Sequence, residues 1–280
     1  MPNEQQAEYW SEQGGPEWVR NESRYDTMLG PIGDDVLAAA RLADGERVLD
    51  VGCGFGTMTV QAARAVAPTG VAVGVDISAA MIERAIAKAG RVPNIEFTVD
   101  DAQTMAVPVQ TFDAVISRMG VMFFDDPVAA FANLRSSSSA GGRLAFACWQ
   151  SAAANRWLRV VGEVFQPFLT EPIPQPPPGA PGPMAFADPD RVRELLLAAG
   201  WRDIELADSP RRLTIGANGV DGAMQQLLNA SVGRAVVPLL SEDSRDEAYA
   251  ALRDELQQHT DGDVVTYDGA VWIVTARAGA

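Results

Sequence analysis

The feature that most constrains the fold is a short apolar strand that runs directly into closely spaced glycines and then into a helix. Residues 48–51 lead into a G-x-G-x-G turn formed by Gly52, Gly54 and Gly56, and helical residues follow. Glycine tolerates positive φ and leaves room for a ligand beside the backbone. A strand, a glycine turn and a helix in this order favour a parallel α/β sheet with a nucleotide-like ligand at the turn.

The pattern between residues 47 and 150 extends this fold class. Short apolar or β-branched runs alternate with helical stretches, which is typical of parallel strands joined by crossover helices. We predict strands at 47–51, 71–76, 95–99, 112–117 and 143–149, and helices at 56–67, 79–89 and 127–134.

The flanking segments are less regular. An aromatic-rich start precedes a helix that we expect Asp34 or Asp35 to cap. Eight prolines between Pro167 and Pro183 predict a loop, because proline lacks an amide donor and fixes φ. Further on we predict a helix at 189–199, strands at 203–207 and 211–215, a helix at 241–258 and a strand at 270–276. We expect an N-terminal helical lid segment at 1–40, a ligand-binding core at 41–150, and a segment at 151–280 that adds a lid insertion and completes the same domain.

Acidic residues around the glycine turn indicate the kind of ligand. Asp76 ends the second predicted strand, where a carboxylate can accept hydrogen bonds from both ribose hydroxyls; a solvated strand-end acid is the alternative. The glycine spacing differs from the G-x-G-x-x-G of dinucleotide-binding turns. Asp50, two residues before Gly52, would repel a pyrophosphate but attract an ammonium. S-adenosylmethionine, which has an ammonium, a sulfonium and no phosphate, therefore fits this turn better than NAD.

Four segments in the expected order resemble class I S-adenosylmethionine-dependent methyltransferases, specifically the bacterial small-molecule branch with a methyltransferase domain of the ubiquinone-biosynthesis type. These segments are residues 48–56, 74–81, 100–102 and 112–115. The resemblance covers roughly residues 45–150. It implies an α/β fold with a Rossmann-like, doubly wound sheet of seven strands, six parallel and one antiparallel, with N-terminal helices and an inserted lid or loop region.

The resemblance also implies roles for residues near the methionine and ribose parts of the cofactor. Gly52 and Gly54 would line the methionine part, with Asp50 near its ammonium. Asp76 would hold the ribose. Ser117, at the carboxyl end of the fourth predicted strand, would face the same crevice.

A second set of residues would hold the adenine. Ile77 and Met81 would enclose the ring, although plain core packing is an alternative. Asp101 would accept the exocyclic amine, or else cap a helix. Ala102 would donate its backbone amide to the ring.

Substrate contacts are less constrained by the sequence. Arg118 follows Ser117 into the crevice and is either a substrate anchor or a surface ion-pair residue. Tyr25 and Trp149 are candidate pocket-wall residues, together with Trp10, Trp18 and Phe168, although aromatic side chains also dominate ordinary cores. No catalytic base is identified: the one histidine, His259, ends a polar helix that looks exposed.

The charge and composition of the chain disfavour some classes of binding partner. The net charge of −15 disfavours nucleic acids and anionic membrane surfaces. Nucleic-acid amino-methyltransferases carry an Asn/Asp-Pro-Pro-Tyr/Phe motif where this chain has residues 117–120, Ser-Arg-Met-Gly.

Cys53 and Cys148 are expected to be buried and unpaired, and no metal site is expected. A cytoplasmic location is predicted, and the sequence leaves a homodimer open.

The function expected is therefore transfer of a methyl group from S-adenosylmethionine to an oxygen, nitrogen or carbon atom of a small, partly apolar molecule. One alternative is a non-catalytic or regulatory protein that binds S-adenosylmethionine. An NAD-dependent oxidoreductase is a second alternative, against which the glycine spacing and Asp50 count.

Overall fold

The computed structural model describes residues 3–106, 109–174, 177, 179–216 and 218–279. Within these residues eight strands form one sheet, with the order β3-β2-β1-β4-β5-β8-β6 and a short β7 paired with β8. The strands are β1 (Arg47–Val51), β2 (Val71–Asp76), β3 (Ile95–Val99), β4 (Phe112–Arg118), β5 (Ser138–Trp149), β6 (Trp201–Gly216), β7 (Thr260–Asp261) and β8 (Val264–Ala278).

The helices flank this sheet or precede it. They are α1 (Glu4–Tyr9), α2 (Gly15–Arg20), α3 (Glu22–Ala40), α4 (Thr57–Ala65), α5 (Ala79–Ala89), α6 (Pro127–Ser137), α7 (Val160–Phe165), α8 (Pro189–Ala198), α9 (Gly219–Asn229), α10 (Ser231–Val236) and α11 (Glu242–Gln257). A π-helical turn at Trp10–Gly14 joins α1 to α2.

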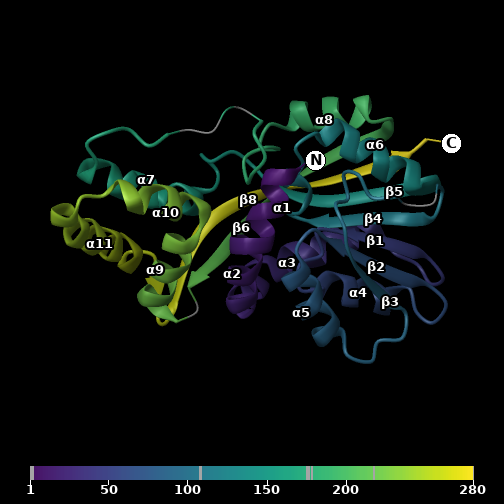
Figure 1. Cartoon of the computed structure of the whole chain (residues 1–280), viewed down its shortest axis with the longest axis horizontal. Helices are drawn as coiled ribbons and strands as arrows, with labels where there is room; N and C mark the ends of the chain where they lie inside the picture. The colour runs from purple at the N-terminus through teal and green to yellow at the C-terminus, as the bar shows by residue number, and fades with distance from the viewer. Residues whose placement is uncertain (1–2, 107–108, 175–176, 178, 217, 280) are drawn as a thin grey trace. The chain divides into compact units, whose positions relative to one another are not determined.

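The order of the first five strands explains the two helical layers. β1 pairs in parallel with both β2 and β4, so the chain winds outward from β1 in two opposite directions. Because parallel crossovers are right-handed, opposite directions place the connecting helices on opposite faces. Figure 1 shows α3, α4 and α5 on one face of these strands and α6 and α8 on the other. The doubly wound fold is thereby confirmed.

β8 runs opposite to β5. The amide of Gln150 donates to the carbonyl oxygen of Ala270 at 3.1 Å, and Arg277 Nη1 donates to the carbonyl oxygen of Gly141 at 3.3 Å. The start of one strand therefore lies beside the end of the other, which defines an antiparallel pair.

β6 is also antiparallel to β8. Arg212 Nε donates to Thr266 Oγ1 at 3.0 Å, whereas a methyl group placed on Gly279 would lie 3.7 Å from Arg202 Nε. β1 to β6 thus share one direction and β8 opposes them. The predicted arrangement of six parallel strands and one antiparallel strand is confirmed, with the short β7 added to it.

Several predicted elements have the observed bounds. The strands at 47–51, 71–76 and 95–99 and the helix at 79–89 agree residue for residue with β1, β2, β3 and α5. Side chains cap two later helices, since that of Asp188 accepts from Asp190 N and that of Ser241 accepts from Ser244 N.

The predicted start of the N-terminal helix was wrong. Neither Asp34 nor Asp35 caps it, because α3 begins at Glu22 and continues through Pro31. Its buried side includes Tyr25, Leu29, Ile32 and Val36, at the three- and four-residue spacing of one helix face. Packing of that face outweighs the breaking effect of one proline.

The two strands predicted at 203–207 and 211–215 are a single strand. β6 continues through Pro210. It lies at one end of the sheet order, where a residue without an amide donor is tolerated because one side of the strand has no partner.

The predicted proline loop is described only in part, because Gln175, Pro176 and Pro178 lie outside the described residues. In the rest of the segment, a 3₁₀ turn at Gln166–Phe168 is the one regular element between residues 167 and 183. Within the described ranges no helix is long and apolar enough to cross a membrane.

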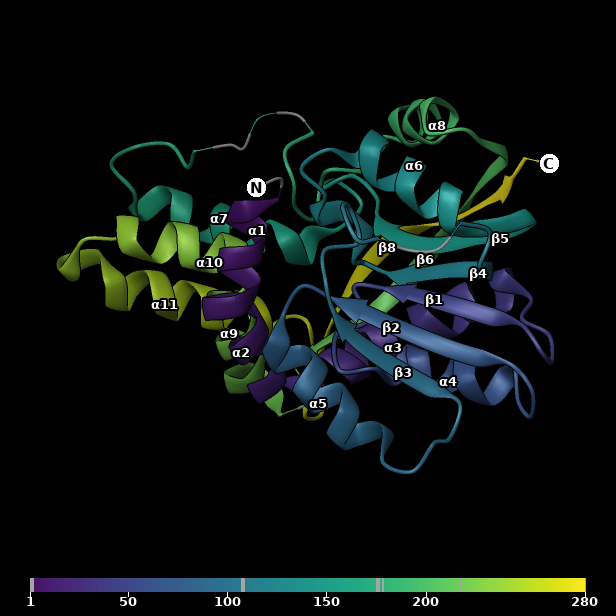
Figure 2. The same ribbon diagram turned by 45° about the vertical axis from the view of Figure 1, so that its right-hand side comes forward.

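The chain divides into two compact units. Unit 1 comprises Met1–Trp149, Gly179–Asp208 and Trp272–Ala280, and unit 2 comprises Gln150–Pro178 and Ser209–Val271. Unit 1 holds β1 to β5 with their helices. Unit 2 holds the helices α7, α9, α10 and α11, which Figure 2 shows grouped together. The glycine turn and all the residues predicted to bind the cofactor belong to unit 1.

Candidate cofactor site

The glycine turn after β1 requires glycine for two different reasons. Gly52 has φ +64°, and a Cβ there would lie 2.8 Å from Gly120 Cα, so the turn after β4 packs directly on it. Gly54 has φ +55°, and a Cβ there would meet no atom within 4 Å. Both residues adopt the left-handed conformation that glycine allows. Gly52 thus serves close packing, while Gly54 borders open space in which a ligand can approach the backbone.

Asp76 connects the end of β2 to the glycine turn. Its Oδ2 accepts from the amide of Gly54 and its Oδ1 accepts from the amide of Ser78, each at 2.9 Å. Burial raises the pKa of Asp76, and hydrogen bonds from backbone amides partly oppose that effect. A carboxylate oxygen has more than one lone pair, so both oxygens can still accept a hydroxyl.

Asp50, on β1, is a buried carboxylate that is only half satisfied. Its side chain is 1% exposed, and Oδ2 accepts from Thr59 Oγ1 at 2.7 Å. Oδ1 has no hydrogen-bond partner within the described part of the chain. Burial raises the pKa of Asp50 to about 7, while the Thr59 hydrogen bond and the charge of Arg118 act in the opposite direction. An unsatisfied buried acceptor is costly and indicates that a donor is missing.

The end of β4 brings two further predicted residues to the turn. Ser117 is buried, and its Oγ donates to the carbonyl oxygen of Val51 at 2.7 Å, so its hydroxyl holds β1 and β4 together. Arg118 Nη2 lies 3.7 Å from Asp26 Oδ1. Asp26 itself comes from α3 and was not predicted as a site residue.

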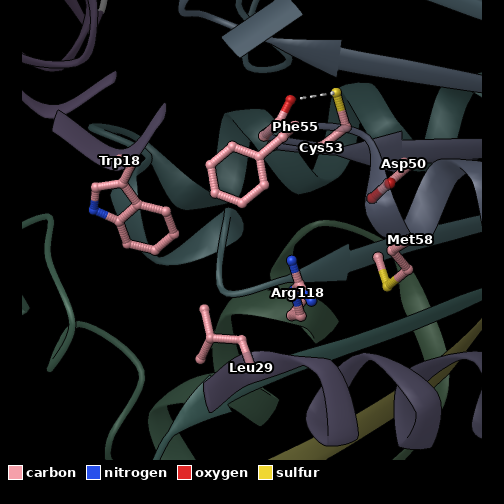
Figure 3. A pocket seen from close by; sticks show the side chains of 9 residues that line it. Trp18, Leu29, Asp50, Cys53, Phe55, Met58 and Arg118 are labelled. Atoms are coloured by element: carbon pink, nitrogen blue, oxygen red, sulfur yellow. Dashed lines mark hydrogen bonds between the residues drawn. The ribbon is translucent and has the colours of Figure 1, made fainter. Parts of the chain in front are cut away.

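A pocket lies at the carboxyl ends of β1 and β4, as Figure 3 shows. Asp50, Gly52, Gly54 and Arg118 line it, so the structure brings four predicted residues together. The remaining lining residues are Trp18, Cys53, Leu29, Phe55 and Met58. Of these, only Trp18 was a predicted pocket-wall residue, and sequence reasoning missed Leu29, Cys53, Phe55 and Met58 as site residues. Phe55 lies inside the glycine turn and Met58 follows it by two residues, which is a local signal; Leu29 arrives from α3 and has none.

The residues predicted to hold the adenine lie after β2 and β3. Ile77 is half-buried, and Met81 and Ala102 are buried. Asp101 Oδ1 accepts from the amide of Gln103 at 3.0 Å and from Asn3 Nδ2 at 3.3 Å. The Asn3 amide is therefore a protein donor at the carboxylate that we predict to accept the adenine amine.

The N-terminal segment packs on the same edge of unit 1. A Cβ on Gly15 would lie 2.2 Å from Ser78 Oγ, so α2 passes directly over the turn after β2. The rings of Trp10 and Phe123 meet edge to face at 5.1 Å. The sequence predicted a lid in residues 1–40, and these contacts place that segment beside the strand ends.

The other predicted aromatic residues lie near the pocket or apart from it. Tyr25 does not line the pocket but stacks on Trp18, which does, with ring centroids 3.8 Å apart. Trp149 is buried at the end of β5 and does not line the pocket. Cys53 and Cys148 are buried and form no disulfide bond. His259 belongs to unit 2, where its Nε2 lies 3.1 Å from Glu255 Oε1.

The residues present fit an adenosine ligand that carries a positive group. Asp50 supplies an unpartnered buried acceptor, Gly54 borders open space, and Asp76 lies at the end of the adjacent strand. A phosphate is disfavoured at this place, because Asp50 would repel it. Among the described residues no group of three His, Cys, Asp or Glu side chains could hold a metal ion.

Comparison with known proteins identifies the core. Residues 48–142 match the model of a methyltransferase domain. The chain is 36% identical over 133 residues to aklanonic acid methyltransferase DauC of a Streptomyces species, covering 45% of this chain and 60% of that protein. It is 27% identical over 257 residues to nocamycin O-methyltransferase of Saccharothrix syringae, covering 88% of this chain and 90% of that protein. The chain thus spans less than two thirds of the first of these relatives.

A solved structure extends the likeness beyond the matched segment. Protein BH2331 of Bacillus halodurans, described as a candidate methyltransferase, has a TM-score of 0.57 and 18% identity, covering 90% of this chain and all of that one. This likeness shows the fold. Residues 48–142 thus match a methyltransferase domain, and the chain shares the fold of that solved structure.

Proposed function

We propose that this protein transfers the methyl group of S-adenosylmethionine to an oxygen atom of a small, partly apolar molecule. The observation that carries the proposal is the buried, half-satisfied carboxylate of Asp50 beside the open space at Gly54. A positively charged ligand without phosphate complements that arrangement, and the methyltransferase match covers the same residues.

The cofactor supplies a methyl group on a sulfonium, from which an acceptor can take it by in-line displacement. The chain's own residues position the reactants. Asp76, fixed by two backbone amides, would hold the ribose, and Asp50 would hold the ammonium. The aromatic side chains of Trp18 and Phe55 line the pocket and exclude water. Holding two reactants in line lowers the barrier chiefly by removing the entropic cost of their encounter.

Two observations favour a small molecule with an oxygen atom as the methyl acceptor. The match to nocamycin O-methyltransferase extends over most of both chains, and its name favours oxygen. The net charge of −15 opposes a nucleic-acid substrate, because a polyanion would be repelled. We therefore propose a small hydroxylated or carboxylated acceptor.

A labelled-methyl assay tests the proposal. The protein would be incubated with S-adenosylmethionine carrying a radiolabelled methyl group and a panel of hydroxylated and carboxylated polycyclic compounds, and organic-phase label would be counted. We expect label with the wild type and background counts with Asp76→Ala, which lacks the proposed ribose ligand. Tight binding of S-adenosylhomocysteine without transfer to any acceptor would instead favour a non-catalytic cofactor-binding protein.

A further inference from the structure

Arg118 is a buried cation with incomplete neutralisation. It is the last residue of β4, and its side chain is only 10% exposed. Among the described residues its one ion-pair partner is Asp26, at the long distance of 3.7 Å, and the carboxylates of Asp50 and Asp34 act on its charge without forming an ion pair with it. A guanidinium carries five donors and stays charged at every ordinary pH, so burial with one distant partner is unfavourable.

Asp26 cannot fully neutralise Arg118, because other groups already share its charge. Lys88 Nζ lies 2.6 Å from Asp26 Oδ2, and Thr57 Oγ1 donates to Asp26 Oδ1 at 3.0 Å. The shorter ion pair is the one with Lys88. Arg118 therefore keeps donors that no described carboxylate engages closely.

Asp50, in the same pocket, has the opposite need: it is a buried acceptor for which a donor is missing among the described residues. Within these residues its Oδ1 has no donor and Arg118 has no carboxylate closer than 3.7 Å, and Figure 3 shows both side chains at the pocket wall. The two groups do not satisfy each other, since no ion pair joins them within the described residues. One small ligand that carries both an ammonium and a carboxylate would satisfy both, and an α-amino acid group has this chemistry.

We propose that Arg118 binds the α-carboxylate of the methionine part of S-adenosylmethionine, whose α-ammonium faces Asp50. This inference rests on the proposed function, because it assigns a residue to the same cofactor. It differs from both roles that the sequence left open for Arg118, a substrate anchor and a surface ion-pair residue. The glycines that border the cofactor, Gly52 and Gly54, line the same pocket as Arg118, whereas an in-line acceptor must approach the methyl from the side opposite the sulfur.

Three ligands separate this role from its alternatives in calorimetric titrations. S-adenosylhomocysteine has the whole amino-acid group, its decarboxylated analogue keeps only the amine, and methylthioadenosine lacks both. Each would be titrated into the wild type, Arg118→Met and a control, Arg253→Met, which removes an exposed arginine that pairs with Asp221 in unit 2. Circular dichroism and thermal melts would confirm folding of each variant.

We expect Arg118→Met to weaken S-adenosylhomocysteine binding by about 10- to 100-fold, the effect of losing a charge-assisted hydrogen-bonded pair. Binding of the decarboxylated analogue and of methylthioadenosine should change by less than about twofold, a small effect on the scale of tenfold per 1.4 kcal/mol. Arg253→Met should leave all three affinities unchanged. If Arg118→Met does not fold, Arg118→Lys keeps the positive charge but lacks the paired donors of the planar guanidinium. We then expect a smaller loss of affinity, confined to S-adenosylhomocysteine.

Two results would overturn the inference. Unchanged binding of S-adenosylhomocysteine in Arg118→Met would show that Arg118 does not bind the cofactor's carboxylate. Equal weakening of the binding of all three ligands would indicate a structural role. Failure of the proposed function has a different outcome, in which the wild type binds none of the three ligands.

Discussion

The two units handle partly buried charge in opposite ways. In unit 2, Glu255 Oε1 lies 3.0 Å from Arg156 Nη2 and 3.1 Å from His259 Nε2. The same oxygen accepts a hydrogen bond from the Tyr267 hydroxyl at 3.2 Å. In the pocket of unit 1, by contrast, Asp50 Oδ1 has no partner in the described chain. Both carboxylates are largely shielded from water, yet Glu255 has three polar partners on one oxygen whereas, among the described residues, Asp50 has one partner, Thr59, on the other oxygen.

The difference teaches where a ligand is required. A network such as that of Glu255, in which three side chains meet one carboxylate oxygen, stabilises its own unit. An open one such as the pair Asp50 and Arg118 is unfavourable until a complementary molecule arrives. We therefore expect ligand binding in the pocket of unit 1 and a structural role for the cluster around Glu255.

The largest effect is expected for Asp76→Ala. Loss of the carboxylate removes both the proposed ribose contacts and the bonds from Gly54 and Ser78 that shape the turn. Two charge-assisted hydrogen bonds are together worth roughly 3–6 kcal/mol, so binding of S-adenosylhomocysteine should fall by about 100-fold or more. Calorimetry would measure the loss, and Asp76→Asn, which keeps one acceptor oxygen, should lose less. Wild-type affinity in Asp76→Ala would remove Asp76 from the site.

A smaller effect on binding, with an opposite effect on stability, is expected for Asp50→Asn. Because burial raises the pKa of Asp50 from 3.8 to about 7, the stability that this group contributes is full below about pH 4 and declines as the pH rises through 7. Asparagine removes that cost and keeps an oxygen for Thr59. At pH 8 the ligand-free variant should be more stable than the wild type by about 1–3 kcal/mol in urea unfolding, with the gap shrinking toward pH 5.

The same substitution should weaken the binding of S-adenosylhomocysteine by about tenfold, because a charged partner of the ammonium is lost. In the wild type the affinity should fall as the pH drops below about 7, since protonation of Asp50 cancels the attraction, and this dependence should be absent in the variant. An Asp50→Asn protein that is less stable at pH 8 and binds equally well would show that Asp50 belongs to a closed network.

Glu255→Gln should affect stability without affecting binding. The side chain of Glu255 is 16% exposed and that of Arg156 is 42% exposed, so solvent screens part of the pair. We expect a loss of about 1–2 kcal/mol in the free energy of unfolding, measured in urea, with S-adenosylhomocysteine affinity unchanged. A loss of affinity would mean that this cluster contributes to the ligand site.

The smallest effect is expected for Glu163→Gln, a matched change at the edge of the same cluster. Glu163 is 38% exposed; its Oε2 lies 3.6 Å from Arg156 Nε, and its Oε1 lies 2.5 Å from Nη1 of Arg159, which is itself 40% exposed. Exposed pairs of this kind contribute about 0–1 kcal/mol. The free energy of unfolding in urea should therefore lie between those of the wild type and Glu255→Gln. A larger loss than in Glu255→Gln would mean that Glu163, and not Glu255, contributes most to the stability of this cluster.

Much of the fold follows from local sequence. β1, β2, β3 and α5 have their predicted bounds because apolar periodicity and turn residues coincide there. α3 was mispredicted since Pro31 breaks the local pattern, whereas the buried face that sustains the helix depends on packing against other elements. Tertiary contacts of this kind are not encoded in a short window of sequence.

The candidate site divides in the same way. The placement of Asp50, Asp76 and the glycines could be predicted, because the carboxyl ends of adjacent parallel strands meet at one edge. The partners of Arg118 and Asp101 could not. Asp26 reaches Arg118 from α3, and Asn3 reaches Asp101 across 98 positions of sequence, so both contacts depend on how the N-terminal segment packs.

Titration of the wild-type protein with S-adenosylhomocysteine and, separately, with NAD tests most directly whether the open pocket of unit 1 is the cofactor site. We predict a 1:1 calorimetric isotherm with a Kd on the order of micromolar for S-adenosylhomocysteine, and no heat of binding for NAD, whose pyrophosphate Asp50 would repel. Binding of NAD alone, or of neither ligand, would contradict the assignment of this pocket.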